Sequence, residues 1–107
     1  MENDEIMNLD PVIHSPNRLA ILSILISVKS AKFMYLREVT GMKDGNLSTH
    51  LSKLEAEGYI TIKKSFEGKK PQTTCAITRK GSAAFEAYLA HMERIVQTQK
   101  DKMEHGG

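Results

Sequence analysis

The apolar pattern of this chain changes its period at Gly58, and this change restricts the fold more than any other feature. Before Gly58, three leucines in 47–54 recur at helical spacing and share an arc of about 60°. After it, isoleucines alternate with polar residues in 59–63, which is the period of a strand. The sequence therefore predicts a short amphipathic helix, capped by Asp44 and ended by Gly58, that leads directly into a strand.

A more apolar helix is predicted near the N-terminus. Ser15 is a suitable N-cap, and Pro16 follows at the first helical position, where its missing N–H costs nothing. Apolar residues then occupy most sides of 16–29, so this helix should be deeply buried. The acidic segment 1–10 is interpreted as an N-terminal extension, with ordered structure expected to begin near Leu9.

A second short helix is predicted over 33–40, after a short connection at 30–32. Leu36 and Val39 supply an apolar pair that should face inward, and Gly41 is placed to end the helix. With the helix that follows, this arrangement gives two short helices joined by a tight turn.

The strand after Gly58 is expected to belong to a hairpin. Residues 67–71 have the composition of a turn, and 73–78 is rich in β-branched residues, as a returning strand would be. A last helix is predicted from a Ser82 cap over 82–103, followed by a frayed tail at 104–107.

The helix before Gly58 carries small hydrogen-bonding and weakly basic side chains opposite its leucines. Such side chains are short enough to enter a major groove, and Asn can pair bidentately with adenine. A water-exposed helix face is the alternative, but such a face usually carries more Glu and Lys four residues apart. The candidate DNA-reading residues of this helix are Asn46, Ser48, Thr49, His50, Ser52 and Lys53.

Positive charge is concentrated in the predicted hairpin. Residues 59–80 contain six basic side chains and one acidic one, whereas the whole chain has a net charge of only +2. A local excess of this kind is typical of a surface that binds a polyanion. A solvated, lysine-rich hairpin is the alternative. The candidate phosphate or minor-groove contacts are Lys63, Lys64, Lys69, Lys70 and Arg79.

Two short helices followed by a β-hairpin form a winged helix–turn–helix. The predicted class is mainly helical α+β, with a two-stranded wing and a C-terminal dimerisation helix. The length of 107 residues favours one domain, 1–107, with 1–10 as its extension.

The last predicted helix has an apolar seam at the 3.5-residue period of a coiled coil. Its members are Phe85, Leu89, Met92, Val96, Gln99 and Met103, with Tyr88 and Ile95 widening the stripe. A long apolar stripe on a terminal helix favours association with a second copy. Packing against the first helix of the same chain is the alternative. The predicted dimer contacts are Phe85, Tyr88, Leu89, Met92, Ile95 and Val96.

Several classes of protein are disfavoured by what the sequence lacks. The one cysteine, Cys75, excludes an internal disulfide and suits the cytoplasm; a buried, inert thiol is its expected state. The four histidines have no metal-site spacing, and no phosphate loop or nucleophile motif occurs. No apolar run is long enough to span a bilayer. We therefore expect no enzyme, no cofactor, no metal and no membrane partner.

Three stretches resemble the small, stand-alone winged-helix DNA-binding regulators of archaea and bacteria that are related to the MarR and ArsR groups. The stretches are VIHSPNRLAILSIL, LREVTGMKDGNLSTHLSKLEAEGYI and KKPQTTCAITRKG. The resemblance implies a homodimeric transcriptional regulator that reads double-stranded DNA with helix 46–57 and wing 63–74. The wing lacks the Asp-x-Arg tip common in MarR proteins, and the metal-binding cysteines of many ArsR sensors are absent, so neither property is carried over.

Two functions of different classes stay open at this stage. The first is a sequence-specific DNA-binding regulator, favoured by the basic hairpin and the small polar helix face. The second is a winged-helix adaptor between proteins that binds no specific DNA. A small-molecule effector is left open, and the sequence identifies none.

Overall fold

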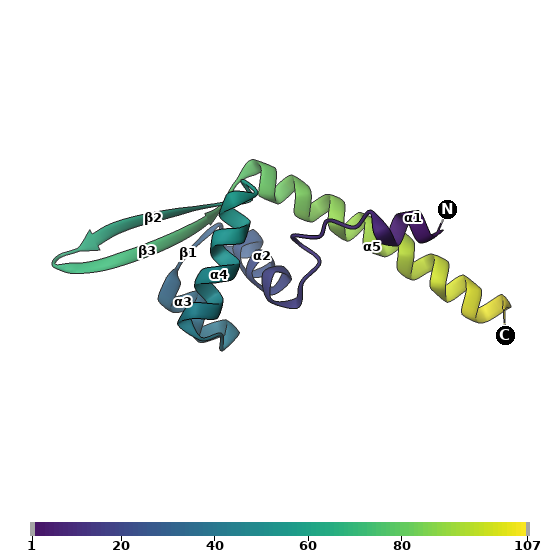
Figure 1. The fold of residues 1–107 in the computed structure, drawn as a ribbon, viewed down its shortest axis with the longest axis horizontal. Helices are drawn as coiled ribbons and strands as arrows, with labels where there is room; N and C mark the ends of the chain where they lie inside the picture. The colour runs from purple at the N-terminus through teal and green to yellow at the C-terminus, as the bar shows by residue number, and fades with distance from the viewer. Residues whose placement is uncertain (1, 107) are drawn as a thin grey trace.

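Five helices and a three-stranded sheet make up residues 2–106, which are the part of the chain that the computed structural model describes (Figure 1). The elements are α1 (Glu2–Met7), α2 (Pro16–Val28), β1 (Ser30–Lys32), α3 (Phe33–Thr40), α4 (Asp44–Ala56), β2 (Ile60–Glu67), β3 (Lys70–Ile77) and α5 (Arg79–His105). The fold is a mainly helical α+β winged helix with a hairpin wing and a long C-terminal helix, as the sequence predicts.

Helices α2, α3 and α4 pack their apolar sides into one core. Ser15 caps α2 by accepting the amide N–H of Arg18, as predicted. In α3 the prediction that Leu36 faces inward is confirmed, because Leu36 is fully buried. The same prediction for Val39 is wrong, because Val39 is 49% exposed. The helix has only eight residues, and one turn of it is enough to reach the core. The fully buried core side chains are Ile13, Ile21, Leu22, Leu25, Leu36, Leu47, Leu51, Leu54, Ile60 and Cys75.

The sheet has the order β1-β3-β2, with both pairings antiparallel. The predicted connection at 30–32 is therefore a strand, whose central residue Ala31 pairs with Cys75. Three residues are too few to show a period, and their partner is more than forty positions away, so only the folded chain reveals this strand. Its effect is to anchor the base of the wing to α2 and α3.

The wing is longer and its turn tighter than the sequence suggests. Strands β2 and β3 pair from Ile60–Ile77 at the base to Glu67–Lys70 at the tip. Only Gly68 and Lys69 connect them, and Gly68 adopts the positive φ, here 65°, that such a loop needs at its first position. The predicted turn over 67–71 therefore shrinks to two residues.

Helix α5 begins earlier than predicted, because Thr78 rather than Ser82 is its N-cap. The Thr78 hydroxyl accepts the amide N–H of Gly81 at 2.9 Å and donates to the carbonyl of Gly58 at 2.6 Å. One side chain thus joins the end of α4, the wing and the start of α5. At its other end α5 continues to His105, so the tail predicted to be frayed is helical in part.

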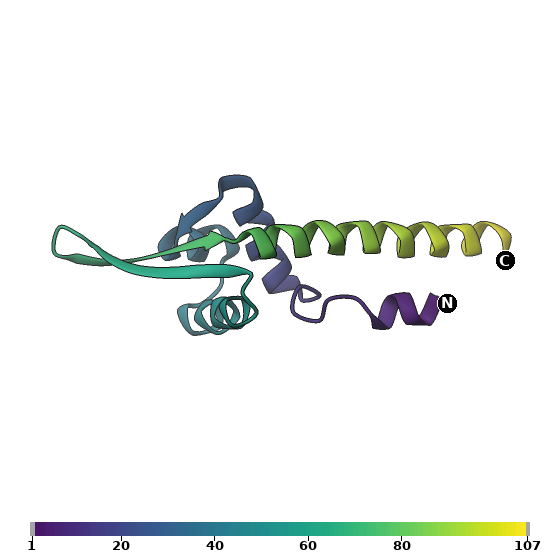
Figure 2. The same cartoon turned by 90° about the horizontal axis from the view of Figure 1, so that it is seen from above.

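The wing and α5 project from opposite sides of the helical body, which gives an elongated molecule of 62 × 25 × 21 Å (Figures 1 and 2). Ordered structure begins earlier than the predicted Leu9, because α1 lies in the predicted N-terminal extension and packs alongside α5. Glu5 and Arg94 approach to 3.7 Å between these helices. Both ends of the described chain therefore lie at the end of the molecule remote from the wing.

Candidate nucleic-acid interface

The predicted reading face of α4 is exposed, and its leucines are buried. Leu47 and Leu54 are fully covered, which fixes how α4 is rotated about its own axis. No other described segment covers the opposite side. The exposed side chains there are Asn46, Ser48, Thr49, Ser52 and Lys53. The Thr49 hydroxyl donates to the carbonyl of Gly45 at 2.9 Å, so its proton is already used within α4. This bond also restrains rotation of the Thr49 side chain, including its methyl group.

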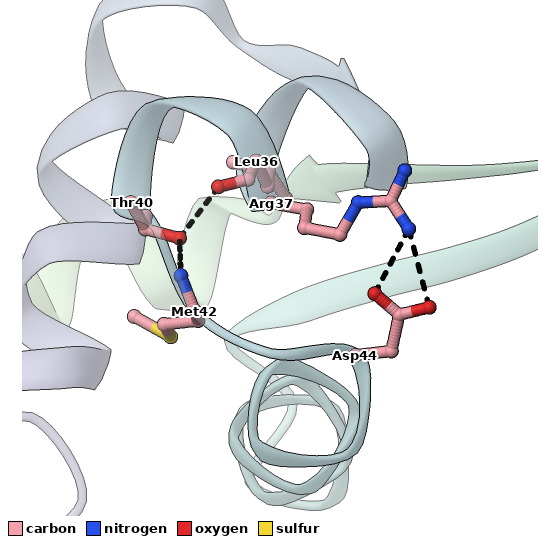
Figure 3. A network of polar contacts seen from close by, with 5 residues as sticks. All are labelled: Leu36, Arg37, Thr40, Met42 and Asp44. Atoms are coloured by element: carbon pink, nitrogen blue, oxygen red, sulfur yellow. Dashed lines mark hydrogen bonds and ion pairs between the residues drawn. The ribbon is translucent and has the colours of Figure 1, made fainter.

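The turn between α3 and α4 holds the start of the reading helix in place (Figure 3). Thr40 donates to the carbonyl of Leu36 at 2.6 Å and accepts the amide N–H of Met42 at 3.3 Å. Gly41 adopts a left-handed φ of 71°, as its predicted role requires. The guanidinium of Arg37 contacts both carboxylate oxygens of Asp44, at 2.9 and 3.2 Å.

Asp44 is not the N-cap of α4, contrary to the prediction. The N-cap is Lys43, which makes no side-chain cap hydrogen bond, and Asp44 is the first helical residue. Its carboxylate still suits the positive end of the helix dipole. Arg37 also partly neutralises the Asp44 carboxylate, which lies at the N-terminal end of α4 beside the predicted DNA-reading residues.

His50 lies on α4, but its ring is bound to α2. Nδ1 of His50 is 3.0 Å from the guanidinium of Arg18, and Nε2 is 3.1 Å from the side-chain amide of Asn17. A guanidinium can only donate, so the unprotonated Nδ1 of His50 accepts the hydrogen bond from Arg18. Burial lowers the pKa of His50, and the positive charges of Arg18 and Lys53 lower it further. The neutral ring therefore connects α4 to α2, and its predicted contact with DNA stays a prediction.

The lysines of the wing point in different directions. Alternation along β2 puts Lys64 on the same face as Ile60 and Ile62, and puts Lys63 on the other face. Lys64 contributes to a hollow of about 340 Å³ between α4 and the wing, with Ser48 and Ser52 on its opposite wall. This hollow brings a cationic wing residue close to the polar face of α4.

The other basic candidates mark the two ends of the hairpin. Lys69 lies in the turn, and Lys70 pairs across the tip with Glu67. The Glu67 carboxylate accepts hydrogen bonds from Lys32, at 3.3 Å, and from Gln72, so its charge is partly compensated. Arg79 is exposed at the base of the wing, as the first residue of α5, far along the hairpin from the tip.

The predicted dimer seam divides between the core and the surface. Phe85 and Tyr88 are buried within the chain itself, where the Tyr88 hydroxyl lies 2.7 Å from Nδ1 of His14. Leu89 and Val96 are 48% and 44% exposed. Met92 and Ile95 are half-buried, so their exposure is intermediate between those of the two pairs. The two alternatives for the seam therefore apply to different residues, and only its outer edge is open to a second copy.

The segment between α1 and α2 is fastened to both the wing base and α5. Asp10 accepts the amide N–H of Val12 at 2.9 Å and also the hydroxyl proton of Tyr59. Burial and this hydrogen bond raise the pKa of Tyr59, and burial raises that of Tyr88. Sequence reasoning missed this network because Asp10 and Tyr59 lie 49 positions apart and meet only in the folded chain. Together with the His14–Tyr88 contact, it connects the segment before α2 to the start of the wing and to α5.

Other chemistry is not evident in the described part of the chain. Residues 2–106 contain no group of three or more His, Cys, Asp or Glu side chains that could hold a metal ion. Cys75 is fully buried, and burial raises its pKa to about 11, as expected of an unreactive thiol. No helix among the described residues is both long and apolar enough to cross a membrane.

Comparison with known proteins agrees with this geometry. The family model for the winged helix DNA-binding domain matches residues 17–96. The uncharacterized protein MJ0432 of Methanocaldococcus jannaschii is 38% identical over 78 residues, which are 73% of this chain and 85% of that protein.

Two solved structures extend the comparison. A transcriptional regulator homologue from Pyrococcus horikoshii OT3 superposes with a TM-score of 0.83 at 26% identity, over 92% of this chain and 96% of that one. The ArsR family transcriptional regulator RHA00566 superposes with a TM-score of 0.56 at 25% identity, over 89% and 93% of the two chains. The chain thus belongs to the winged helix DNA-binding domain family and is a DNA-binding transcriptional regulator with MarR- and ArsR-type structural neighbours, not an enzyme.

Proposed function

We propose that the protein binds specific double-stranded DNA as a homodimer, with α4 in the major groove and the wing on the flanking backbone or minor groove. The observation that supports this most directly is the exposed, small and polar face of α4, with Asn46, Ser48 and Ser52 uncovered and the leucines turned inward. A helix enters the major groove only if its leading side chains are short, and base edges are read by hydrogen-bonding groups.

The wing supplies the sequence-independent part of the proposed binding. Lys64, Lys69 and Lys70 are exposed on a hairpin that projects past α4 (Figure 1). Each lysine that neutralises a phosphate releases a bound counterion, which favours association and makes it depend on salt. Lys63 lies on the other face of the wing and is expected to contribute less, as is Arg79 at the wing base.

A second copy is the proposed partner of α5. Leu89, Val96 and Met103 are all exposed and lie seven residues apart, so they form one stripe along α5. The pattern suits pairing with an identical helix. Two copies joined there could present their α4 helices roughly 34–36 Å apart, which matches successive major grooves.

A salt titration of duplex binding tests the DNA-binding proposal. We expect the association constant of the wild-type protein to fall steeply with salt, measured by fluorescence anisotropy on duplexes selected from a random pool. Lys69→Ala with Lys70→Ala should reduce the slope by roughly 2, because each lost phosphate contact removes about 0.9. Lys100→Ala, at the far end of α5, is the matched control and should leave the slope unchanged.

Reading of base edges is tested separately from phosphate binding. Asn46→Ala should relax the sequence preference at one position of each half-site and cost about 1–3 kcal/mol on the selected duplex. It should barely affect binding to unrelated duplexes. If the wild-type protein bound no duplex at low salt, the adaptor function would replace the regulator proposed here.

A further inference from the structure

Phe66 occupies an unusual place for a large apolar side chain. It is 74% exposed near the tip of the wing, where its cross-strand partner is Pro71. Single exposed apolar residues are common on protein surfaces. Phe66 differs from them in its surroundings, because Lys64 precedes it on the same face of β2 and Lys69 lies in the adjoining turn, while Lys70 pairs with Glu67 on the other face. The ring is therefore an apolar tip within a cationic surface.

The register shows which way this tip faces. Phe66 follows Ile60, Ile62 and Lys64 on one face of β2, and that face borders the hollow beside α4. Ile62 lines this hollow together with Ser48. Phe66 lies four residues farther out, which is roughly 13 Å at the rise of an extended strand. Neighbouring grooves of a duplex are about half a turn apart, roughly 17 Å, so the tip has the reach of the adjacent minor groove.

We propose that Phe66, backed by Pro71, inserts into the minor groove next to the major groove that α4 occupies. The inference rests on the DNA-binding function proposed above and adds a residue that discriminates between base pairs. The floor of the minor groove carries the exocyclic amino group of guanine at G·C pairs and no such donor at A·T pairs. A phenyl ring cannot accept that hydrogen bond, so Phe66 should favour A·T pairs beneath the wing.

Charge decides between DNA and another protein copy as the partner of this tip. The surrounding lysines attract the phosphates that line a minor groove on both sides. Two wing tips brought together would instead repel each other, and one exposed ring with one proline is far too small for a stable protein interface. The duplex is therefore the occupant that fits both the apolar tip and its cationic edge.

Base analogues can test the minor groove without changing the major groove. The probe is a duplex selected by the wild-type protein from a random pool. At A·T pairs beneath the wing, 2,6-diaminopurine replaces adenine and adds the minor-groove amino group. At G·C pairs, inosine replaces guanine and removes it. We expect the addition to weaken wild-type binding roughly tenfold and the removal to strengthen it.

Phe66→Ala should bind the unmodified duplex roughly tenfold more weakly, keep the wild-type salt slope, and lose its response to both analogues. Met7→Ala, which removes a side chain that is 80% exposed on α1 and lies outside the proposed DNA and dimer surfaces, is the control and should behave as wild type. The proposal fails if Phe66→Ala keeps wild-type affinity, or if its response to the analogues persists. Either result would leave salt-dependent DNA binding intact, whereas a wild-type protein that binds no duplex would overturn the proposed function itself.

Discussion

At the scale of single residues, His50 shows how the fold can reassign a side chain. Its position on α4 favours contact with DNA, but Arg18 and Asn17 of α2 hold both ring nitrogens. The ring therefore fixes where α4 lies relative to α2. Loss of this contact should disturb DNA reading indirectly, through the placement of the whole helix.

The lowered pKa of His50 predicts a pH dependence of stability. Because the folded-state pKa lies below the usual 6.5, the unfolded chain takes up this proton first as the pH falls. The contribution of His50 to the free energy of unfolding is therefore complete above about pH 6.5 and decreases as the pH falls below it. Urea unfolding at pH 8 to 5 should show a steeper loss for the wild type than for His50→Gln. Parallel curves would contradict this prediction.

Gly81 is a second residue whose role depends on a distant contact. A Cβ at this position would lie 2.1 Å from the carbonyl oxygen of Tyr59, so α5 and the start of the wing could not keep their present spacing. Gly81→Ala should therefore lower the free energy of unfolding by about 1–3 kcal/mol. Gly45→Ala is the matched control, because no atom lies within 4 Å of its Cβ position. It should instead be stabilising by about 0.4–1 kcal/mol, and the comparison is made by urea unfolding.

At the scale of elements, the joints between helices and strands are made by a few polar contacts. Thr40 and Gly41 shape the turn before α4, and Arg37 fastens that turn to Asp44 (Figure 3). The Arg37–Asp44 pair is well exposed, so its contribution to stability is expected to be small. Its main effect is on geometry, since it sets where α4 begins.

The start of α5 offers a test between two candidate caps. Thr78 caps the helix in the structure, whereas Ser82 is the cap that the sequence alone suggests. Thr78→Ala should lower the free energy of unfolding by about 1 kcal/mol or more, since two hydrogen bonds are lost. Ser82→Ala should change it by less than about 0.5 kcal/mol. Thermal unfolding followed by circular dichroism would distinguish them, and equal effects would contradict the assignment of Thr78.

At the scale of the whole molecule, the wing and the far end of α5 are two separate surfaces that differ in chemistry. The wing and α4 present cationic and small polar groups, and α5 presents an apolar stripe. The wing and the free end of α5 lie at opposite ends of the molecule (Figures 1 and 2). Asp10–Tyr59 and His14–Tyr88 connect the two parts. If two copies pair through α5 as proposed, a change in that pairing would be transmitted to the positions of the two α4 helices.

Charge on the apolar stripe should separate the two copies. Leu89→Glu with Val96→Glu would bury carboxylates in the proposed interface, so we expect a monomer by sedimentation equilibrium and a marked loss of affinity for the selected duplex. Ala83→Glu with Ala90→Glu is the matched control, since it has the same seven-residue spacing roughly a third of a turn round the helix. A wild-type monomer at tens of micromolar would contradict the dimer itself.

The sequence by itself determined the features that depend on neighbouring residues. The leucines of 47–54, the Ser15 cap, the left-handed Gly41 and the change of period at Gly58 each express preferences acting over a few positions, and the structure confirms them. They were enough to identify the winged helix and the exposed face of α4.

Only the tertiary structure decided the features that require contact between distant segments. Strand β1 exists because β3 pairs with it, Val39 is exposed because one turn of α3 already reaches the core, and His50 is held by Arg18 from a different helix. In the apolar seam of α5, Phe85 and Tyr88 are buried because the rest of the chain covers them, whereas Leu89 and Val96 are exposed. Local dihedral preference carries no information about which remote segment fills the space beside a side chain, and burial depends on that segment.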